Sequence, residues 1–346
     1  MPRRRAGLLA AAVLCAGCGP APVESVQLLA IGTVIEVTVE APPPGWRAQV
    51  RADVEPWLDG WGAQMYAFGD GELAQANARW RDGECVAVSG ELDHLIRLAG
   101  QLEQRHGDRF VPALADVTRL WRLHDTDASG WRPPDDAQVQ AAMQPAPSMR
   151  HLVRKDGDAV CATGPIALDV GGFAKGIALN RLARALEDRG LTPALVNIGG
   201  DVLAIGQRSH RPWRLGIRHP RDDGALASLA VQPGETVMTS GDYARQVTID
   251  GTRYAHILDP ATGRPIQGIA SVTVVGRDPV AADAAATALF VAAGRTWAAG
   301  RWPDLPAVAD AGTFVVVAAD ESVAVSRDLV GRITWQAPDL VVHERP

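Results

Sequence analysis

Lysine is nearly absent from this chain: of its 34 lysines and arginines, only Lys155 and Lys175 are lysines. Beyond the N-terminal segment, no apolar run approaches the roughly 20 residues that a membrane-spanning helix needs. The same part of the chain contains no internal repeat and no low-complexity linker. These absences exclude repeat architectures and predict one compact, soluble body.

The N-terminus predicts a lipoprotein signal peptide over 1–17. Three arginines, Arg3 to Arg5, precede a short apolar run and then small residues before Cys18, which is the pattern of a secretory signal. The end of this segment, "LCAGC", resembles a bacterial lipobox with Cys18 as the lipid-bearing residue. An ordinary secreted or merely tethered protein is the alternative. The mature domain would then span 18–346.

Charge and cysteine content narrow the class of protein further. Removal of the signal leaves 31 basic against 40 acidic residues, so nucleic acid is not an expected partner. Cys85 and Cys161 are too few for a disulfide framework. A single disulfide in an oxidising compartment and two separately buried thiols both stay open.

Hydrophobic periodicity predicts a mixture of helices and strands. Helices are expected over 46–65, 89–106 with Ser89 as N-cap, 112–124, 173–189 ending at Gly190, and 279–291. Strands are expected over 25–41, 165–170, 271–276, 313–319 and 322–328, with hairpins at Asp156-Gly157, at Gly199-Gly200 and around Gly251. A loop is expected over 124–136, and strand 165–170 with the next helix and strand reads as a βαβ-like unit.

The stretch "LDVGGFAKG" places Asp169 and Lys175 on either side of Gly171 and Gly172 at an expected strand-to-helix junction. Glycines let a ligand approach the backbone, free N–H groups at a helix start bind anionic oxygens, and lysine meets a phosphate as a point charge. We therefore expect a phosphate site, against the simpler hypothesis of a tight turn. The spacing matches neither GxGxxG nor the P-loop, so neither of those nucleotide folds is supported.

In "VAADAAATALF", Asp283 and Thr287 lie four residues apart and so share one face of an alanine-rich helix. A carboxylate and a hydroxyl stacked in this way suit Mg²⁺, which needs few protein ligands besides phosphate oxygens and water. A solvated aspartate and a threonine bonded to its own helix backbone are the alternative.

His256 is an acid/base candidate, because "YAHILDPATGRPI" places it in an expected strand three residues before an Asp-Pro turn, near the Ser-Gly-Asp loop of "TSGDYARQ". A buried histidine with a purely structural role is the alternative. The other histidines fall in helical faces, loops or termini, where a surface role is expected: His94, His106, His124, His151, His210, His219 and His343.

Several segments, in order along the chain, together resemble the motifs of the ApbE family of FAD:protein FMN transferases. They are "LDVGGFAKGIALNR", "LVNIGGDVLAIG", "TSGDYAR", "YAHILDPATGRPI" and "SVTVVGRDPVAADAAATALF". Earlier, "AIGTVIEV" is similar to the family's Met-Gly-Thr strand, with Ile31 in place of Met, and "AFGDGELAQAN" to its Ser-Glu-Leu segment. "DRFVPALADVTRLWRL" is similar to a further segment, but Val111 stands where Asp is usual.

The resemblance implies an α+β (α/β mixed) fold, with mixed sheets and flanking helices around a central FAD cleft. It implies a Mg²⁺-dependent transferase that moves FMN from FAD onto a threonine or serine of a target flavoprotein and releases AMP. Members of this family face the periplasm and are often lipoproteins, and their usual targets are subunits of membrane redox systems. Because Ala286 stands where some relatives have an acid that binds a second ion, we expect one metal ion.

By the same resemblance, His256 and Lys175 are the expected catalytic residues. The backbone carbonyl of Gly172 and the side chains of Asp283 and Thr287 are expected to hold Mg²⁺. Residues expected to contact FAD are Ile31, Phe68, Arg109, Phe110, Asp169, Lys175 and Ile257. Two other activities stay open: an FAD pyrophosphatase that uses water in place of the target hydroxyl, and a lipoprotein that binds FAD without chemistry.

Overall fold

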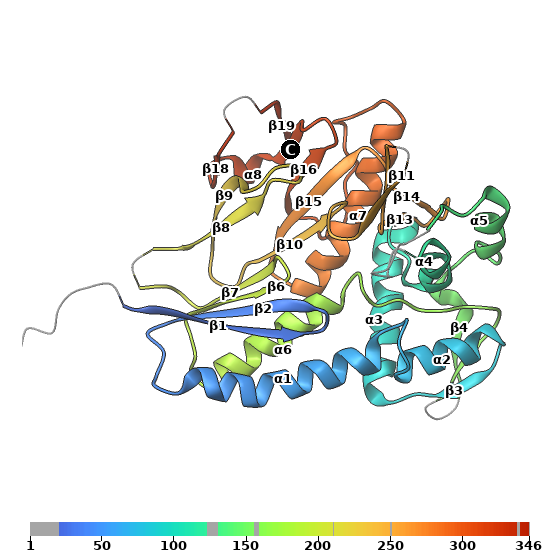
Figure 1. Ribbon diagram of the computed structural model, residues 1–346, viewed down its shortest axis with the longest axis horizontal. Helices are drawn as coiled ribbons and strands as arrows, with labels where there is room; N and C mark the ends of the chain where they lie inside the picture. The colour runs from blue at the N-terminus through green and yellow to red at the C-terminus, as the bar shows by residue number, and fades with distance from the viewer. Residues whose placement is uncertain are drawn as a thin grey trace, which may run out of the picture.

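The computed structural model describes residues 21–122, 131–155, 159–209, 211–249, 251–337 and 340–345. Its largest element is a nine-stranded sheet that crosses the molecule (Figure 1). In spatial order its strands are β1 (Val23–Ala30), β2 (Thr33–Glu40), β6 (Ala194–Ile198), β7 (Asp201–Ile205), β10 (Thr236–Gly241), β15 (Ile269–Gly276), β16 (Thr313–Ala318), β17 (Val323–Ser326) and β19 (Val342–Arg345). Neighbouring strands are antiparallel except for β17 and β19.

Helices cover one face of this sheet. They are α1 (Trp46–Met65), α3 (Gly90–His106), α6 (Ala174–Glu187) and α7 (Pro279–Ala298), with α1 running along the β1–β2 hairpin and α7 lying against β10 and β15 (Figure 1). The main core between these layers includes Ile35, Leu58 and Phe290, each at most 1% exposed. Nearly all of α7 is buried, because it lies between the sheet and the other helices.

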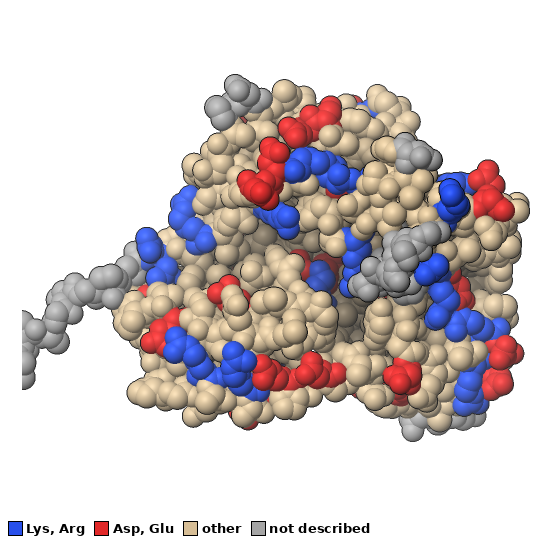
Figure 2. Space-filling view, viewed as in Figure 1, with Lys and Arg blue, Asp and Glu red and all other residues tan. Residues whose placement is uncertain are grey.

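The other face of the sheet is covered from β7 and β10 to β15, β16 and β17. A second sheet of β8 (Trp213–Arg218), β9 (Ala225–Val231) and β18 (Ile333–Trp335), with α8 (Arg327–Val330), packs there through a separate apolar cluster. The outer face of β1 and β2 is left more open, and Leu29 is 74% exposed. Figure 2 shows a hollow near the middle of the face in view, in which acidic and basic atoms are visible.

Two small units complete the fold. One contains α2 (Glu72–Arg81) and a sheet of β3 (Cys85–Ala87), β5 (Ala159–Ala162) and β4 (Leu152–Arg154); a disulfide joins Cys85 to Cys161 within it, which confirms the paired alternative. The other contains α4 (Ala115–Trp121), α5 (Asp136–Ala142), the β11 (Gln246–Ile249) and β12 (Thr252–Ala255) hairpin, and the β13 (Leu258–Asp259) and β14 (Arg264–Pro265) pair. Trp121 and Trp131 pack on Tyr254 there and fix the β11–β12 hairpin to the helices.

Most of the expected elements are confirmed. Helix α1 has the predicted bounds, Ser89 caps α3 by accepting the Leu92 N–H at 3.1 Å, and α6 ends before Gly190, whose φ of 64° is left-handed. The Gly199-Gly200 and Gly251 hairpins are also present. Helix α7 extends to Ala298, beyond the predicted end at 291, because its apolar character continues through that extra length.

Two expected strands are wrong. The segment 25–41 is a hairpin and not one strand, because Ile31 and Gly32 adopt left-handed φ angles of 48° and 72° and reverse the chain. The segment 165–170 is extended but belongs to no sheet, so the predicted βαβ-like unit is absent from the described part of the chain. The buried Asn77 side chain replaces a neighbouring strand there: it accepts the Leu168 N–H at 2.7 Å and donates to its carbonyl at 2.8 Å.

Other differences are smaller. The helix expected over 112–124 begins as a 3-10 turn, Pro112–Leu114, followed by α4. Helices α2 and α5 and strands β8 and β9 had no sequence prediction, and α5 begins at Asp136, the last residue of the expected loop 124–136. His106 is 4% exposed, so the surface role expected for it is wrong.

Some of the expected features lie outside the described residues, namely Cys18, the Asp156-Gly157 turn, His124 and His210. In the described part of the chain, no helix combines the length and the apolar character needed to cross a membrane.

Candidate active site

The candidate site forms where the first turns of α6 and α7 cross. Gly176 permits this crossing, because a Cβ placed on it would lie 2.5 Å from the Pro279 carbonyl oxygen. The close approach brings Asp283 of α7 to the start of α6, where Gly176 donates its backbone N–H to Oδ2 of Asp283 at 3.2 Å. The helix start at which we expect an anion to bind therefore lies directly beside the expected metal-binding carboxylate.

Lys175 lies between two buried carboxylates. Its ammonium contacts Oδ2 of Asp201, and its Nζ is 4.0 Å from Oδ1 of Asp283. Asp201 begins β7, is 1% exposed and also accepts the Thr239 N–H at 2.7 Å. Burial alone would lower the pKa of Lys175, but Asp201 and Asp283 together raise it above its ordinary value. Lys175 therefore stays charged at every physiological pH.

Asp283 is left with excess negative charge around it. Burial raises its pKa to about 7, Lys175 opposes that shift, and the neighbouring Asp201 adds to it. Two carboxylates share the single positive charge of Lys175, so a further cation at this place would be stabilised.

Hydroxyl groups complete the oxygen-rich side of the site. Thr287 lies one turn after Asp283 on α7, and its Oγ1 is 3.3 Å from Oγ of Ser240 at the end of β10. A Cβ placed on Gly172 would lie 3.9 Å from the same Thr287 oxygen, so the backbone of Gly172 faces this point. One carboxylate, hydroxyls and a backbone segment without a side chain suit a hard divalent cation such as Mg²⁺. The described ranges contain no cluster of three or more His, Cys, Asp or Glu side chains that could hold a metal ion, so an ion here would be held largely by hydroxyl, carbonyl, phosphate and water oxygens.

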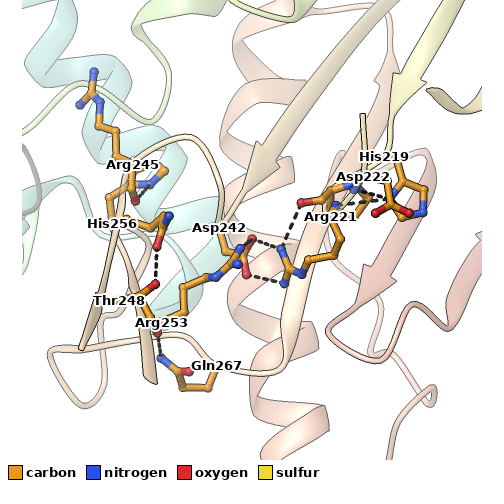
Figure 3. A network of polar contacts seen from close by, with 11 residues as sticks. His219, Arg221, Asp222, Asp242, Arg245, Thr248, Arg253, His256 and Gln267 are labelled. Carbon is orange, nitrogen blue, oxygen red and sulfur yellow. Dashed lines mark hydrogen bonds and ion pairs between the residues drawn. The ribbon is translucent and has the colours of Figure 1, made fainter. Parts of the chain in front are cut away.

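His256 directly follows β12 and is held by the residue opposite it on the hairpin. Its backbone N–H donates to the Arg245 carbonyl at 3.1 Å, and its Nδ1 lies 3.3 Å from the same oxygen (Figure 3). Because a carbonyl only accepts, Nδ1 carries the proton, and Nε2 keeps its lone pair. The residue is partly exposed. Burial among the surrounding residues is still the main cause that lowers the pKa of His256 to about 4, and the positive charges of Arg245 and Lys175 lower it further. The imidazole is therefore neutral near pH 7.

An aromatic and aliphatic wall adjoins the charged cluster. Phe110 is 5% exposed, and a Cβ on Gly172 would lie 2.8 Å from its ring, so the Phe110 ring fills the space that this glycine leaves. Phe173 packs edge-to-face on Phe110 with centroids 6.4 Å apart. Ile257 is buried next to His256. The structure thus brings Phe110, Gly172 and the Lys175 cluster together, as the sequence predicted.

The other residues expected to contact FAD make contacts within the protein. Ile31 forms the turn between β1 and β2, and a Cβ on Gly62 of α1 would lie 2.6 Å from its side chain. Phe68 stacks under the Arg119 guanidinium, and Arg109 donates to the Ala307 carbonyl at 3.4 Å. Asp169 accepts the Gly171 N–H at 2.8 Å and shapes the turn before α6. Their contact with a cofactor stays a prediction.

The sequence interpretation missed two side chains of the site, Asp201 and Ser240. Both lie within segments that carry the family resemblance, "LVNIGGDVLAIG" and "TSGDYAR". The sequence did contain a signal for Asp201: this acidic residue directly follows a Gly-Gly turn and begins a strand whose other residues are apolar. Such an acid is buried with its strand and therefore needs a cationic partner.

Comparison with known proteins agrees with this geometry. The ApbE family model matches residues 31–308. An FAD:protein FMN transferase of Rhodobacter capsulatus is 34% identical over 301 residues, which cover 85% of this chain and 57% of the relative, so the chain spans little more than half of that protein. The Vibrio cholerae FAD:protein FMN transferase is 29% identical over 82% of this chain and 86% of its own length.

Solved structures show the same fold. The ApbE protein of Thermotoga maritima superposes with a TM-score of 0.77 at 26% identity, covering 89% of this chain and 98% of its own. The Pseudomonas stutzeri flavinyl transferase ApbE, in its apo form, has a TM-score of 0.69 at 26% identity over 87% and 93% of the two chains. These matches confirm the α+β fold that the sequence predicted. Sequence motifs, fold and the geometry of the site agree, and the chain belongs to the ApbE family.

Proposed function

We infer that this protein is an FAD:protein FMN transferase. The observation that carries this inference is the charged cluster of Lys175, Asp201 and Asp283 at the start of α6. Thr287 lies one turn after Asp283, and the charge of Lys175 acts on the neutral His256. The ApbE relatives of R. capsulatus and V. cholerae are named for this activity, which supports the inference.

The reaction exchanges the phosphoanhydride bond of FAD for a phosphoester bond to the target. The oxygen of a threonine or serine hydroxyl on the target bonds to the FMN phosphorus of FAD, and the bond from that phosphorus to the bridging oxygen breaks. The electron pair of the broken bond leaves with AMP. The hydroxyl proton goes to Nε2 of His256, which the Nδ1 contact with Arg245 leaves free to accept it.

Charge on the phosphate oxygens has to be stabilised in this exchange, because a phosphoryl transfer depends mainly on positioning and electrostatics. Lys175 lies at the helix start where those oxygens would bind, beside the backbone of Gly172, which faces Thr287. The Gly172 carbonyl, Asp283 and Thr287 would hold Mg²⁺ at one site. A bound Mg²⁺ neutralises negative charge on the diphosphate and orients its oxygens.

We propose the same cellular setting that the sequence predicted. The target is a flavoprotein subunit of a membrane or periplasmic redox system, and the enzyme reaches it from the envelope through a lipid on Cys18. The Cys85–Cys161 disulfide supports this location, because such bonds persist in oxidising compartments and are rare in the cytosol.

An assay with the mature protein, FAD, Mg²⁺ and a purified apo flavoprotein subunit tests the activity. The expected result is acid-stable yellow fluorescence on the target band, with AMP released in equal amount. Replacement of the accepting threonine by alanine should remove the fluorescence. Release of free FMN and AMP without labelling would show a pyrophosphatase instead, and unchanged FAD would show a binding protein; either outcome overturns the proposed function.

A further inference from the structure

Arg295 joins three parts of the structure that surround the candidate site. It lies in the last turn of α7, on the same helix as Asp283 and Thr287. Its Nε and Nη2 donate to the two carboxylate oxygens of Asp259 at 3.1 and 2.6 Å. Its Nη1 donates to Oδ2 of Asp108 at 2.7 Å, and Nη2 also donates to the Asp108 carbonyl at 2.9 Å.

The contact between Arg295 and Asp259 holds the turn that follows His256. Asp259 lies three residues after His256, is 8% exposed and accepts the Ala261 N–H at 2.9 Å through its side chain. Its carbonyl accepts the N–H groups of Thr262 and Gly263 at 3.1 and 2.7 Å. Only Ile257 and Leu258 separate His256 from Asp259, so the guanidinium fixes the segment 256–259, called the His256 strand below, relative to α7.

The contact between Arg295 and Asp108 holds the segment that leads into Phe110. Asp108 lies in the 3-10 turn Gly107–Arg109, directly before the ring that packs against Gly172. Asp108 and Asp259 are 151 positions apart in the chain, and no direct contact is needed between them, because one planar guanidinium binds both. The Arg295 donors are directed at these two residues, and a role in binding substrate is not required to explain them.

We propose that Arg295 is a positioning residue for the transfer step: it fixes the His256 strand, through Asp259, to the helix that carries Asp283 and Thr287, and uses Asp108 as a second anchor. This inference rests on the proposed transferase function. Arg295 does not touch the reacting atoms. Its effect reaches the reaction through the placement of His256, and a displacement of about 1 Å at a catalytic group can cost about 10²-fold in rate.

The test is a double-mutant cycle between Arg295→Gln and His256→Ala, with flavin transfer to an apo flavoprotein subunit as readout. Arg295→Gln is expected to lower kcat for transfer by about 10- to 100-fold while the FAD Kd changes much less. In the His256→Ala background the same change should lower kcat by roughly twofold or less, because a variant that lacks the His256 imidazole has no base left to misplace. Arg295→Lys should restore little, because a lysine ammonium does not reproduce the planar fork.

The matched control is Arg264→Gln. Arg264 lies on β14, close to the same turn, and its ion pair with Asp136 is exposed. Removal of this pair should leave kcat within roughly twofold of the wild type. Asp108→Asn gives a milder variant that opens only the second anchor and should show a smaller loss of kcat with the same dependence on His256.

A structural readout separates this inference from the proposed function. Ile266 donates its N–H to the Ile257 carbonyl at 2.9 Å, so hydrogen exchange at Ile266 reports on the His256 strand without any turnover. Exchange there should quicken in Arg295→Gln and not in Arg264→Gln. The positioning role would be overturned if Arg295→Gln lowered kcat by the same factor in the wild type and in His256→Ala. Unchanged hydrogen exchange at Ile266 would also overturn it. A wild type that transfers no flavin would instead refute the function, while the exchange result still decides the role of Arg295.

Discussion

The ammonium of Lys175 contacts the carboxylate of Asp201, a side chain that is only 1% exposed. This pair joins the first turn of α6 to the start of β7. Asp201 is further held by the Thr239 N–H at 2.7 Å, so the carboxylate is fixed before any ligand binds. Lys175 is therefore a member of the folded core as well as the expected phosphate contact, and these two roles respond differently to substitution.

Replacement of Lys175 by methionine should affect both stability and catalysis. It leaves Asp201 and Asp283 without their shared cation, and breaking a fully buried pair in this way costs about 3–5 kcal/mol. The loss should be smaller here, because the Lys175 side chain is 34% exposed. Lys175→Arg should retain most of the stability but not the activity, since a guanidinium does not place its charge at the same point. Urea unfolding and transfer assays on both variants check this, and full activity in Lys175→Arg would contradict the point-charge role.

Asp283→Asn should separate metal binding from folding. An amide carries no charge to bury, and burial already raises the pKa of Asp283 to about 7, so the variant should be at least as stable as the wild type in metal-free buffer. Added Mg²⁺ should raise the melting temperature of the wild type and not that of the variant, because a ligand stabilises only the state that binds it. Thermal unfolding with EDTA or Mg²⁺ measures both effects. An equal Mg²⁺ shift in the two proteins would remove Asp283 from the metal site.

The sequence allowed much of the site to be predicted, because its residues are close together in the chain or share one helix. Asp283 and Thr287 follow from helical spacing, and Lys175 from the Gly-Gly helix start. Asp201 was not predicted as the partner of Lys175, because 26 positions separate them and their contact depends on the register of β6, β7 and β10. Local patterns contain no information on such register.

The errors in the predicted fold have a similar origin. Ile31 has a high strand propensity, yet it occupies a left-handed turn, so periodicity joined β1 and β2 into one strand. The segment 165–170 has a strand-like composition, but the distant Asn77 side chain and the backbone of Pro112 and Ala115 supply its hydrogen bonds in place of a neighbouring strand. In both cases a tertiary contact or a turn geometry decides the structure, and neither is visible in hydrophobic periodicity.

Gly176→Ala should destabilise the protein and disturb the site. The new Cβ would lie 2.5 Å from the Pro279 carbonyl oxygen and 2.6 Å from the Val280 Cα, and backbone atoms cannot move aside as a flexible side chain can. Overpacking of this kind costs about 1–3 kcal/mol, and it should lengthen the Gly176 to Asp283 hydrogen bond.

Gly100→Ala is the matched control for this change. Gly100 also lies inside a helix, α3, but nothing stands within 4 Å of its Cβ position, so the substitution should stabilise the helix by about 0.5–1 kcal/mol. Denaturant unfolding measures both variants. Equal effects would show that α6 and α7 have room to separate at Gly176.

The pKa of His256 gives a prediction for acid pH. The folded-state value of about 4 lies below the ordinary 6.5, so the unfolded chain takes up the proton first as pH falls. This histidine therefore reduces stability progressively from about pH 6.5 down to about pH 4, and His256→Gln should flatten that part of the stability profile. Unfolding midpoints measured across this range check the sign, and an unchanged slope in His256→Gln would contradict it.

Binding of FAD should move the His256 pKa upward. The two factors that lower it besides burial are the positive charges of Arg245 and Lys175, and the negative diphosphate of FAD would offset both. A higher pKa makes the ring a better proton acceptor for the target hydroxyl near neutral pH. Titration of the His256 ring by NMR should therefore give a midpoint near 4 in the free protein and a higher one with FAD bound. A free-protein midpoint near 6.5, or no change with FAD, would show that this ring does not sense the charges of the site.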